Sequence, residues 1–116
     1  MRSGVIGAVM ALAAAPAFAE PDILSVVYSC ERGVTIPVTY VNGADGSVAV
    51  LQVEGRQIAL PLAKSASGAR FAREQVSGYD WWNKGQGATL AWFDADKGEE
   101  VFLYMECKET ADAAAP

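Results

Sequence analysis

Between residues 24 and 108 the chain is a series of short stretches in which apolar and polar residues alternate, or in which β-branched and aromatic residues predominate. Such stretches are typical of β-strands with one buried face. Glycine-containing pairs such as Arg32-Gly33, Glu54-Gly55 and Ser77-Gly78 separate them and are typical of turns. No window of helical period is long enough to compete. We therefore predict eight strands, at 24–30, 35–41, 47–53, 56–62, 69–75, 79–83, 88–95 and 101–108.

Eight short strands with short connections predict an all-β fold, a small antiparallel eight-stranded β-barrel, with a tightly closed sandwich as the alternative. Pro37 has no amide hydrogen to give to a ladder, so the strand at 35–41 is predicted to be an edge strand or to carry a bulge. Edge strands can support or block association of two copies, so the sequence leaves a homodimer open.

Residues 1–19 have the organisation of a cleavable signal peptide. Met1-Arg2 supplies a positive start, residues 5–15 are almost entirely apolar, and Ala17-Phe18-Ala19 forms a small-x-small cleavage site. A membrane anchor needs about 20 apolar residues, whereas this run is shorter and is interrupted by Pro16. No cysteine stands at the cleavage point to carry a lipid. We predict export to an oxidising compartment without a membrane anchor, and a bacterial periplasm fits best.

These boundaries leave one small domain, residues 20–109, followed by an alanine-rich tail, residues 110–116, that lacks core residues. The chain has 9 Lys and Arg against 14 Asp and Glu, a formal net charge of −5. An acidic surface argues against nucleic acid and anionic lipid as partners, since both require dense positive charge. It favours a cationic partner, although solubility alone also explains the acidity.

The two cysteines, Cys30 and Cys107, stand near the two ends of the predicted domain. Their separation does not fit a C-x-x-C redox or zinc motif, whereas two cysteines in an exported domain usually pair. We predict a Cys30–Cys107 disulfide that joins the first and last strands and makes closure of the barrel plausible. In the chain-entropy model, a disulfide that closes such a long loop stabilises the folded protein by about 4 kcal/mol.

The sequence offers little catalytic chemistry. It contains no histidine, which removes Ser–His and Cys–His pairs and the commonest transition-metal ligand. Asp94, Asp96, Gly98 and Glu99 resemble part of a calcium loop, but the full pattern needs further oxygen ligands at fixed offsets. An acidic hairpin turn is the better interpretation of these residues. We predict that the protein is not an enzyme and holds no metal or cofactor.

Two loops in the second half remain as candidates for function. Ser65-Ala66-Ser67-Gly68 has small side chains and can form a slim protrusion, and Lys84 follows two tryptophans, Trp81-Trp82. Such loops can present one polar side chain each at the same end of a β-structure. Arg70 either pairs with an acidic residue within the barrel or contributes to its rim. On composition alone, ordinary turns, a solvated lysine and core tryptophans explain these residues better.

Four motifs occur in a fixed order along the chain. They are Tyr28-x-Cys30, Ser65-Ala66-Ser67-Gly68-Ala69-Arg70 followed by Phe71, Trp82-Asn83-Lys84-Gly85 with Ala88-Thr89-Leu90, and the late Cys107. In this order, between two framing cysteines, they resemble the MliC/PliC family of bacterial inhibitors of c-type lysozyme. The likeness spans residues 28–107.

The resemblance implies a compact eight-stranded barrel that plugs the active-site cleft of the enzyme and so protects bacterial peptidoglycan. Ser67 and Lys84 correspond to the family residues that reach the catalytic carboxylates, and Gly68, Arg70 and Trp82 support them. Lysozyme uses two carboxyl groups, one as acid and one as nucleophile. Because c-type lysozymes are typically strongly basic, the resemblance also gives the acidic chain a cationic partner.

Three features depart from the family pattern. Phe71 stands where the family usually has tyrosine, the Ala72–Asp80 connection is longer than usual, and the lipoprotein cysteine of membrane-bound members is missing. The last of these points to the periplasmic branch. The alternative function is a non-catalytic periplasmic barrel that binds a small apolar ligand or serves a structural role in the envelope.

Overall fold

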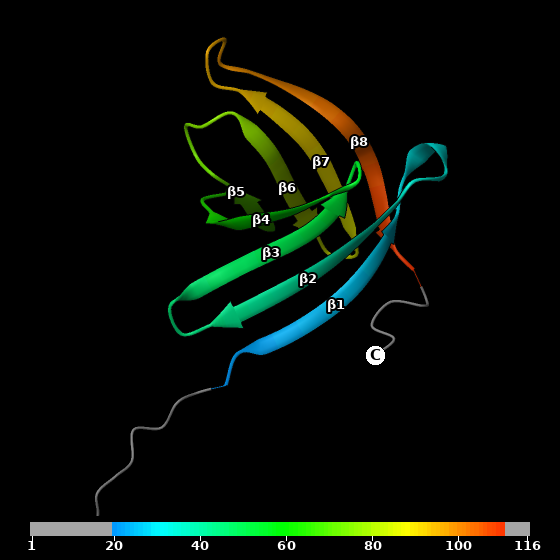
Figure 1. The fold of residues 1–116 in the computed structure, drawn as a ribbon, viewed down its shortest axis with the longest axis vertical. Helices are drawn as coiled ribbons and strands as arrows, with labels where there is room; N and C mark the ends of the chain where they lie inside the picture. Colours follow the sequence, from blue (N-terminus) through cyan, green and yellow to red (C-terminus); the bar gives the residue numbers. More distant parts are fainter. Residues whose placement is uncertain (1–19, 111–116) are drawn as a thin grey trace, which may run out of the picture.

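In a computed structural model of the protein, eight antiparallel strands close into a barrel in sequence order (Figure 1). The structure describes residues 20–110, so the predicted signal peptide and residues 111–116 of the predicted tail lie outside it. The elements are β1 (Asp22–Ser29), η1 (Glu31–Gly33), β2 (Thr35–Gly43), β3 (Gly46–Val53), β4 (Arg56–Ala63), β5 (Ala69–Ala72), β6 (Gly78–Lys84), β7 (Gly87–Asp94) and β8 (Glu99–Glu109). The predicted eight-stranded barrel is confirmed. Within residues 20–110, no helix has the length and apolar character to cross a membrane.

Alternate positions of the strands fill the barrel with apolar side chains. The largest of the side chains without exposed surface are Tyr28, Ile36, Leu51, Trp81 and Leu90. Burial of a side chain of this size contributes about 1.5–3 kcal/mol. The alternation of apolar and polar residues in the sequence therefore corresponds to the inner and outer faces of the sheet.

A short hydrogen-bonded chain crosses this core. The indole nitrogen of Trp81 donates to the hydroxyl of Tyr40 at 2.8 Å, and the hydroxyls of Tyr40 and Tyr28 are 2.8 Å apart. Burial raises the pKa of both tyrosines. These contacts satisfy the polar tips of three large side chains and connect β1, β2 and β6 through the interior.

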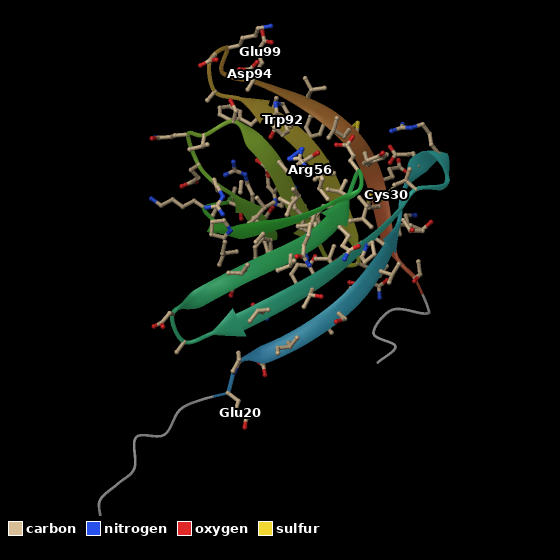
Figure 2. The ribbon with its side chains drawn as sticks, in the orientation of Figure 1. Glu20, Cys30, Arg56, Trp92, Asp94 and Glu99 are labelled. Carbon is tan, nitrogen blue, oxygen red and sulfur yellow. A yellow bond between two sulfur atoms is a disulfide. The ribbon has the colours of Figure 1, made fainter. Side chains whose placement is uncertain are left out.

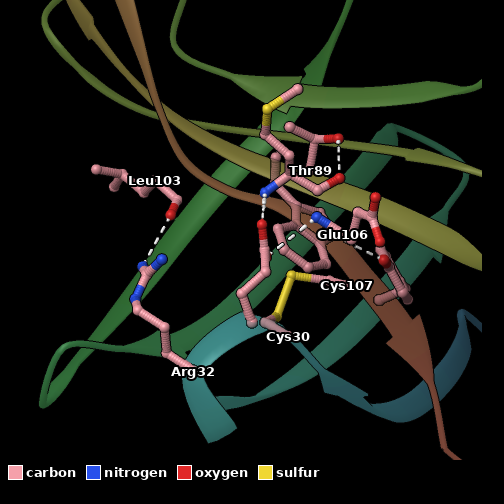
Figure 3. Close-up of a disulfide and its surroundings, with 10 residues drawn as sticks. Cys30, Arg32, Thr89, Leu103, Glu106 and Cys107 are labelled. Carbon is pink, nitrogen blue, oxygen red and sulfur yellow. Dashed lines mark hydrogen bonds between the residues drawn. A yellow bond between two sulfur atoms is a disulfide. The ribbon is translucent and has the colours of Figure 1, made fainter.

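The barrel closes through a short seam between its first and last strands. Only two residue pairs of β1 and β8 face each other in the ladder, Tyr28 with Glu109 and Ser29 with Lys108. Beside them, Cys30 and Cys107 form the predicted disulfide across 77 residues of sequence (Figure 3). The amide of Thr110 donates to the carbonyl of Val27 at 3.0 Å. The earlier residues of β1 pair with β2 alone, so the two terminal strands are strongly staggered.

Side chains from η1 cover the part of β8 that β1 does not reach. Ala88 pairs with Cys107 and Leu90 pairs with Tyr104, with a register shift between them, so β8 has an extra residue opposite Thr89. The amides of Met105 and Glu106 both donate to the carboxylate of Glu31, at 2.9 and 3.1 Å. These bonds lower the pKa of Glu31. Arg32 donates to the carbonyl of Leu103 at 3.1 Å (Figure 3).

Two details of the predicted strands are wrong. The strand predicted at 69–75 ends at Ala72, because the chain turns through Gln75, whose φ is +66°. The strand containing Pro37 is not an edge of the barrel, since β2 pairs with both β1 and β3. It carries no bulge either, because both of its ladders run without a shift of register. Pro37 lies opposite Val27 of β1 and just before the β3 ladder begins at Val38. One side of β2 is unpaired there, so the missing amide hydrogen is tolerated.

Candidate functional site

The two candidate loops lie at the same end of the barrel, as expected from the sequence. Residues 64–68 connect β4 to β5, and residues 85–86 connect β6 to β7. Because the strands alternate in direction, these connections share one end with the β2–β3 turn (Figure 1). We call this end of the barrel the loop end. The connections β3–β4, β5–β6 and β7–β8 lie at the opposite end.

Gly68 brings the two loops into direct contact. Its φ is +67°, and a Cβ atom placed on it would lie 2.5 Å from the carbonyl oxygen of Asn83 and 2.7 Å from Cγ of Lys84. Only glycine fits such a position. The indole nitrogen of Trp82 also donates to the carbonyl of Ser67 at 2.8 Å. The two loops therefore form one continuous surface instead of two independent protrusions.

The polar groups of Ser67 and Lys84 both project from this surface. Both residues are exposed. Within the described residues, the Ser67 hydroxyl makes no hydrogen bond and Lys84 has no acidic partner. By contrast, the hydroxyl of Ser65 donates to the carbonyl of Gly68 at 3.1 Å. The Lys84 ammonium lies 4.4 Å from the centre of the Trp82 ring, a cation–π contact that favours one position of a long side chain.

Arg70 pairs inside the structure, which was one of its two predicted roles. Its Nε donates to Asp80 at 2.8 Å, and Asp80 is only 4% exposed. Its Nη1 donates to the carbonyl of Lys64 at 3.1 Å and lies 3.5 Å from Glu74. Arg70 therefore holds the start of the β4–β5 loop against β6. The carboxylate of this pair is buried, whereas the Arg70 side chain is 26% exposed. Loss of the arginine is destabilising because it leaves a buried charge without its partner.

Two of the departures from the family pattern lie outside the contact between the two loops. Phe71 points into the barrel, is 3% exposed, and packs with its ring centre 5.5 Å from that of Tyr40. The longer connection between Ala72 and Asp80 turns at the opposite end of the barrel. Neither departure alters the contact between the Ser67 loop and the Lys84 turn.

The acidic turn that resembled a calcium loop is also at the far end. Asp94 and Glu99 lie beside the β7–β8 turn (Figure 2). One oxygen of Asp94 accepts the amides of Asp96 and Lys97 at 3.0 and 3.3 Å. That oxygen caps the turn, which is a common role for aspartate in hairpins.

The structure also reveals residues to which the sequence gave no role. Asn83 belongs to the Trp82–Gly85 motif, but its side-chain oxygen is buried without a hydrogen-bond partner among residues 20–110. A groove of about 430 Å³ runs beside Lys84 on the outer surface, lined among others by Trp82, Thr89, Phe102 and Met105. The groove combines β6, β7 and β8, so no local sequence signal could have located it.

Comparison with known proteins places the chain among lysozyme inhibitors in sequence and structure. The sequence model of the family described as membrane-bound lysozyme-inhibitor of c-type lysozyme, MliC, matches residues 28–99. Two curated relatives are each named membrane-bound lysozyme inhibitor of C-type lysozyme. The Cupriavidus necator protein is 40% identical over 70 residues, which are 60% of this chain and 54% of the relative. The Pseudomonas aeruginosa protein is 40% identical over 97 residues, 83% of this chain and 72% of the relative. The chain thus spans about half the length of the first relative.

Solved structures agree with the sequence relatives. Pseudomonas aeruginosa MliC in complex with hen egg white lysozyme matches with a TM-score of 0.62 and 35% identity, covering 90% of this chain and all of the other. PliC-St, a periplasmic lysozyme inhibitor of C-type lysozyme from Salmonella typhimurium, matches with a TM-score of 0.63 and 25% identity, covering 77% and 99%. The Adhesin Complex Protein of Neisseria meningitidis, at 18% identity and a TM-score of 0.53, shares the fold alone.

Proposed function

The chain belongs to the family of membrane-bound lysozyme inhibitors of c-type lysozyme, and we propose that it inhibits such an enzyme by inserting Ser67 and Lys84 into the active-site cleft. One observation carries this proposal. A hydroxyl and an ammonium group are both exposed on two loops that are packed on each other at the loop end. Neither group has a partner within residues 20–110.

The chemistry of the pair suits a cleft that contains two carboxyl groups. A hydroxyl donates a hydrogen bond to a carboxyl in either protonation state, whereas an ammonium group pairs with the ionised one. Charge-assisted hydrogen bonds in a cleft from which water is excluded are stronger than exposed ion pairs. The inhibitor needs no reaction of its own, so we propose that it is not an enzyme.

The loop end is ordered before it meets the enzyme. A mobile lysine loses about 2 kcal/mol of side-chain entropy when it is fixed. Contact with the Trp82 ring and with Gly68 already restricts Lys84, and the Trp82 bond fixes the backbone at Ser67. Less ordering therefore remains for the binding step, which favours affinity.

The predicted leader indicates the compartment in which the protein acts, and the net charge affects the rate at which it meets its target. We propose that residues 1–19 direct export to the periplasm and that residues 20–109 form the inhibitor domain. The chain carries a formal net charge of −5. Long-range attraction to a basic enzyme accelerates association, and salt weakens this effect.

Substitution of the two projecting residues tests the proposal. We expect Ser67→Ala and Lys84→Ala to weaken inhibition of a c-type lysozyme by about tenfold or more each, because each removes a charge-assisted bond. The double variant should be weaker still. The assay follows the clearing of a suspension of peptidoglycan cells, with circular dichroism as the check of folding. Lys97→Ala is the matched control, since Lys97 is an exposed lysine in the turn at the opposite end.

Full inhibition by the folded double variant would show that Ser67 and Lys84 are not the inserting residues.

A specific observation favours one alternative function, the binding of a small apolar ligand, because the groove beside Lys84 has a volume of about 430 Å³. If that is the function, the purified wild-type protein will not slow the lysis of cells by lysozyme. The same assay thus separates the two functions.

A further inference from the structure

A second cavity opens at the loop end, inside the ring of strands. It has a volume of about 220 Å³ and lies between β1 and β2 on one side and β5 and β6 on the other. We call it the mouth cavity; its walls include Leu24, Tyr28, Tyr40, Phe71, Asn83 and Glu109. The cavity opens at the same end of the barrel as the surface proposed to enter the enzyme. Ala69 and Asn83, which line it, are the sequence neighbours of Gly68 and Lys84.

Oxygen-bearing side chains give the mouth cavity its polarity: besides the two tyrosines, they are Asn42, Asn83 and Glu109. Burial is the main cause of the raised pKa of the Tyr28 and Tyr40 hydroxyls, and the negative charge of Glu109 adds a smaller contribution. Glu109 is exposed, and no ion pair involves it within the described residues. The Asn83 oxygen is enclosed and lacks a donor there. A buried acceptor without a partner costs about 1–3 kcal/mol of free energy. A ligand whose donor bonds to this oxygen recovers a free energy of similar size.

The Asn83 amide can reach the cavity by a small movement. The last torsion of an asparagine side chain is broad and soft. Half a turn about that torsion exchanges the amide oxygen and nitrogen. Since the same side chain lines the cavity, we expect the exchange to offer the oxygen to a ligand there. The movement requires no change of the backbone and therefore leaves the adjoining Lys84 in place.

The remaining walls favour an organic cation over other ligands. Three aromatic residues, Tyr28, Tyr40 and Phe71, surround the cavity. Tyr28 is fully buried, while Tyr40 and Phe71 keep 7% and 3% of their surface exposed. Aromatic rings combined with an anionic group form the usual environment for ammonium and guanidinium groups. An anion would be repelled by Glu109. A volume of about 220 Å³ is below the range of roughly 300–1,000 Å³ for drug-sized ligands, so it suits a single side chain.

We propose that the mouth cavity takes an arginine or lysine side chain of the bound c-type lysozyme, as a third contact beside Ser67 and Lys84. This inference rests on the proposed function. Glu109 pairs with the cation, and Asn83 accepts one of its hydrogen bonds. The basic surface expected of such an enzyme provides the partner, and the cavity opens at the same end of the barrel as the inserting loops.

Neutralisation of Glu109 tests the contact within the complex. We expect Glu109→Gln to weaken lysozyme binding by about tenfold, since a charge pair at the edge of an interface becomes a neutral contact. Glu99→Gln is the matched control. It removes the same charge from the same strand, but at the opposite end of β8, so it reports the effect of net charge alone. Equal affinities for these two variants overturn the inference. If Ser67→Ala and Lys84→Ala still impair inhibition, the proposed function stands without it.

Titration of the protein alone tests the chemistry of the cavity. We expect n-butylguanidinium to cause saturable shifts of the Asn83 side-chain amide and Leu24 methyl signals in NMR spectra. The shifts should persist in Glu99→Gln and be lost in Glu109→Gln. No saturable shift in the wild-type protein overturns the inference. Binding of the probe without any loss of lysozyme affinity in Glu109→Gln also overturns it, because the cavity then serves a free amine or guanidine instead of the enzyme.

Discussion

Replacement of Gly68 by alanine probes the contact between the two loops. The added Cβ would lie 2.5 Å from the Asn83 carbonyl oxygen, whereas ordinary van der Waals contact begins at 3.4 Å. The loops must therefore separate by about 1 Å. Alanine at a φ of +67° costs a further 1–2 kcal/mol or so, and overpacking against backbone typically costs about 1–3 kcal/mol. We expect Gly68→Ala to lower the free energy of unfolding by about 2–5 kcal/mol.

Gly85→Ala provides a matched control within the same site. Gly85 has a φ of +60°, but a Cβ there has no neighbour within 4 Å. This variant carries the conformational cost without the clash, so we expect a loss of only about 1–2 kcal/mol. The difference between the two variants measures the contact between the loops.

Inhibition should separate the two variants more sharply than stability does. Binding sites have to be held within about 0.5 Å of their productive geometry, so a shift of about 1 Å at Gly68 displaces Ser67 from Lys84. We expect Gly68→Ala to lose most of its inhibition and Gly85→Ala to keep it. Urea unfolding followed by tryptophan fluorescence gives the stability, and the cell-clearing assay gives the inhibition. Equal values for both variants in both assays would refute a packed contact between the loops.

Three further predictions concern the frame of the site. Replacing Cys30 and Cys107 by serine should lower the free energy of unfolding by about 4 kcal/mol, and the reduced wild-type protein should match the variant in urea. Arg70→Met should cost about 3 kcal/mol in the same measurement, because it leaves Asp80 buried without its partner. Glu31→Gln should destabilise the protein at neutral pH but not in acid. Since folding lowers the pKa of Glu31, its contribution is present above the ordinary value of 4.5 and disappears as the pH falls through the lowered value.

Most of the fold could be predicted because its signals are local. Glu54-Gly55 predicts a two-residue hairpin, and both residues have positive φ, +53° and +75°. The early end of β5 had a weaker signal, since Gln75 is not a residue that typically marks a positive φ. The stagger of β1 against β8 and the extra residue opposite Thr89 depend on pairing between distant strands, which residue patterns do not encode.

The candidate site could be predicted in part. The motifs around Ser67 and Lys84 are contiguous, so their resemblance to a family was visible in the sequence. The pairing of Arg70 with Asp80 was left open, because it depends on the register of β5 and β6. The role of Glu109 at the mouth cavity had no signal, since β8 meets β1 there only after the barrel closes.

The seam between β1 and β8 also bears on the order of folding. Its pairing and the Cys30–Cys107 bond join segments 77 residues apart, and such distant contacts form slowly. The loops that carry Ser67 and Lys84 instead connect strands that are neighbours in the sequence, β4 with β5 and β6 with β7. These hairpins can form while the newly made chain is still reduced. The surface proposed to meet the enzyme can therefore be assembled before the barrel is sealed, and oxidation then fixes a shape that is already present.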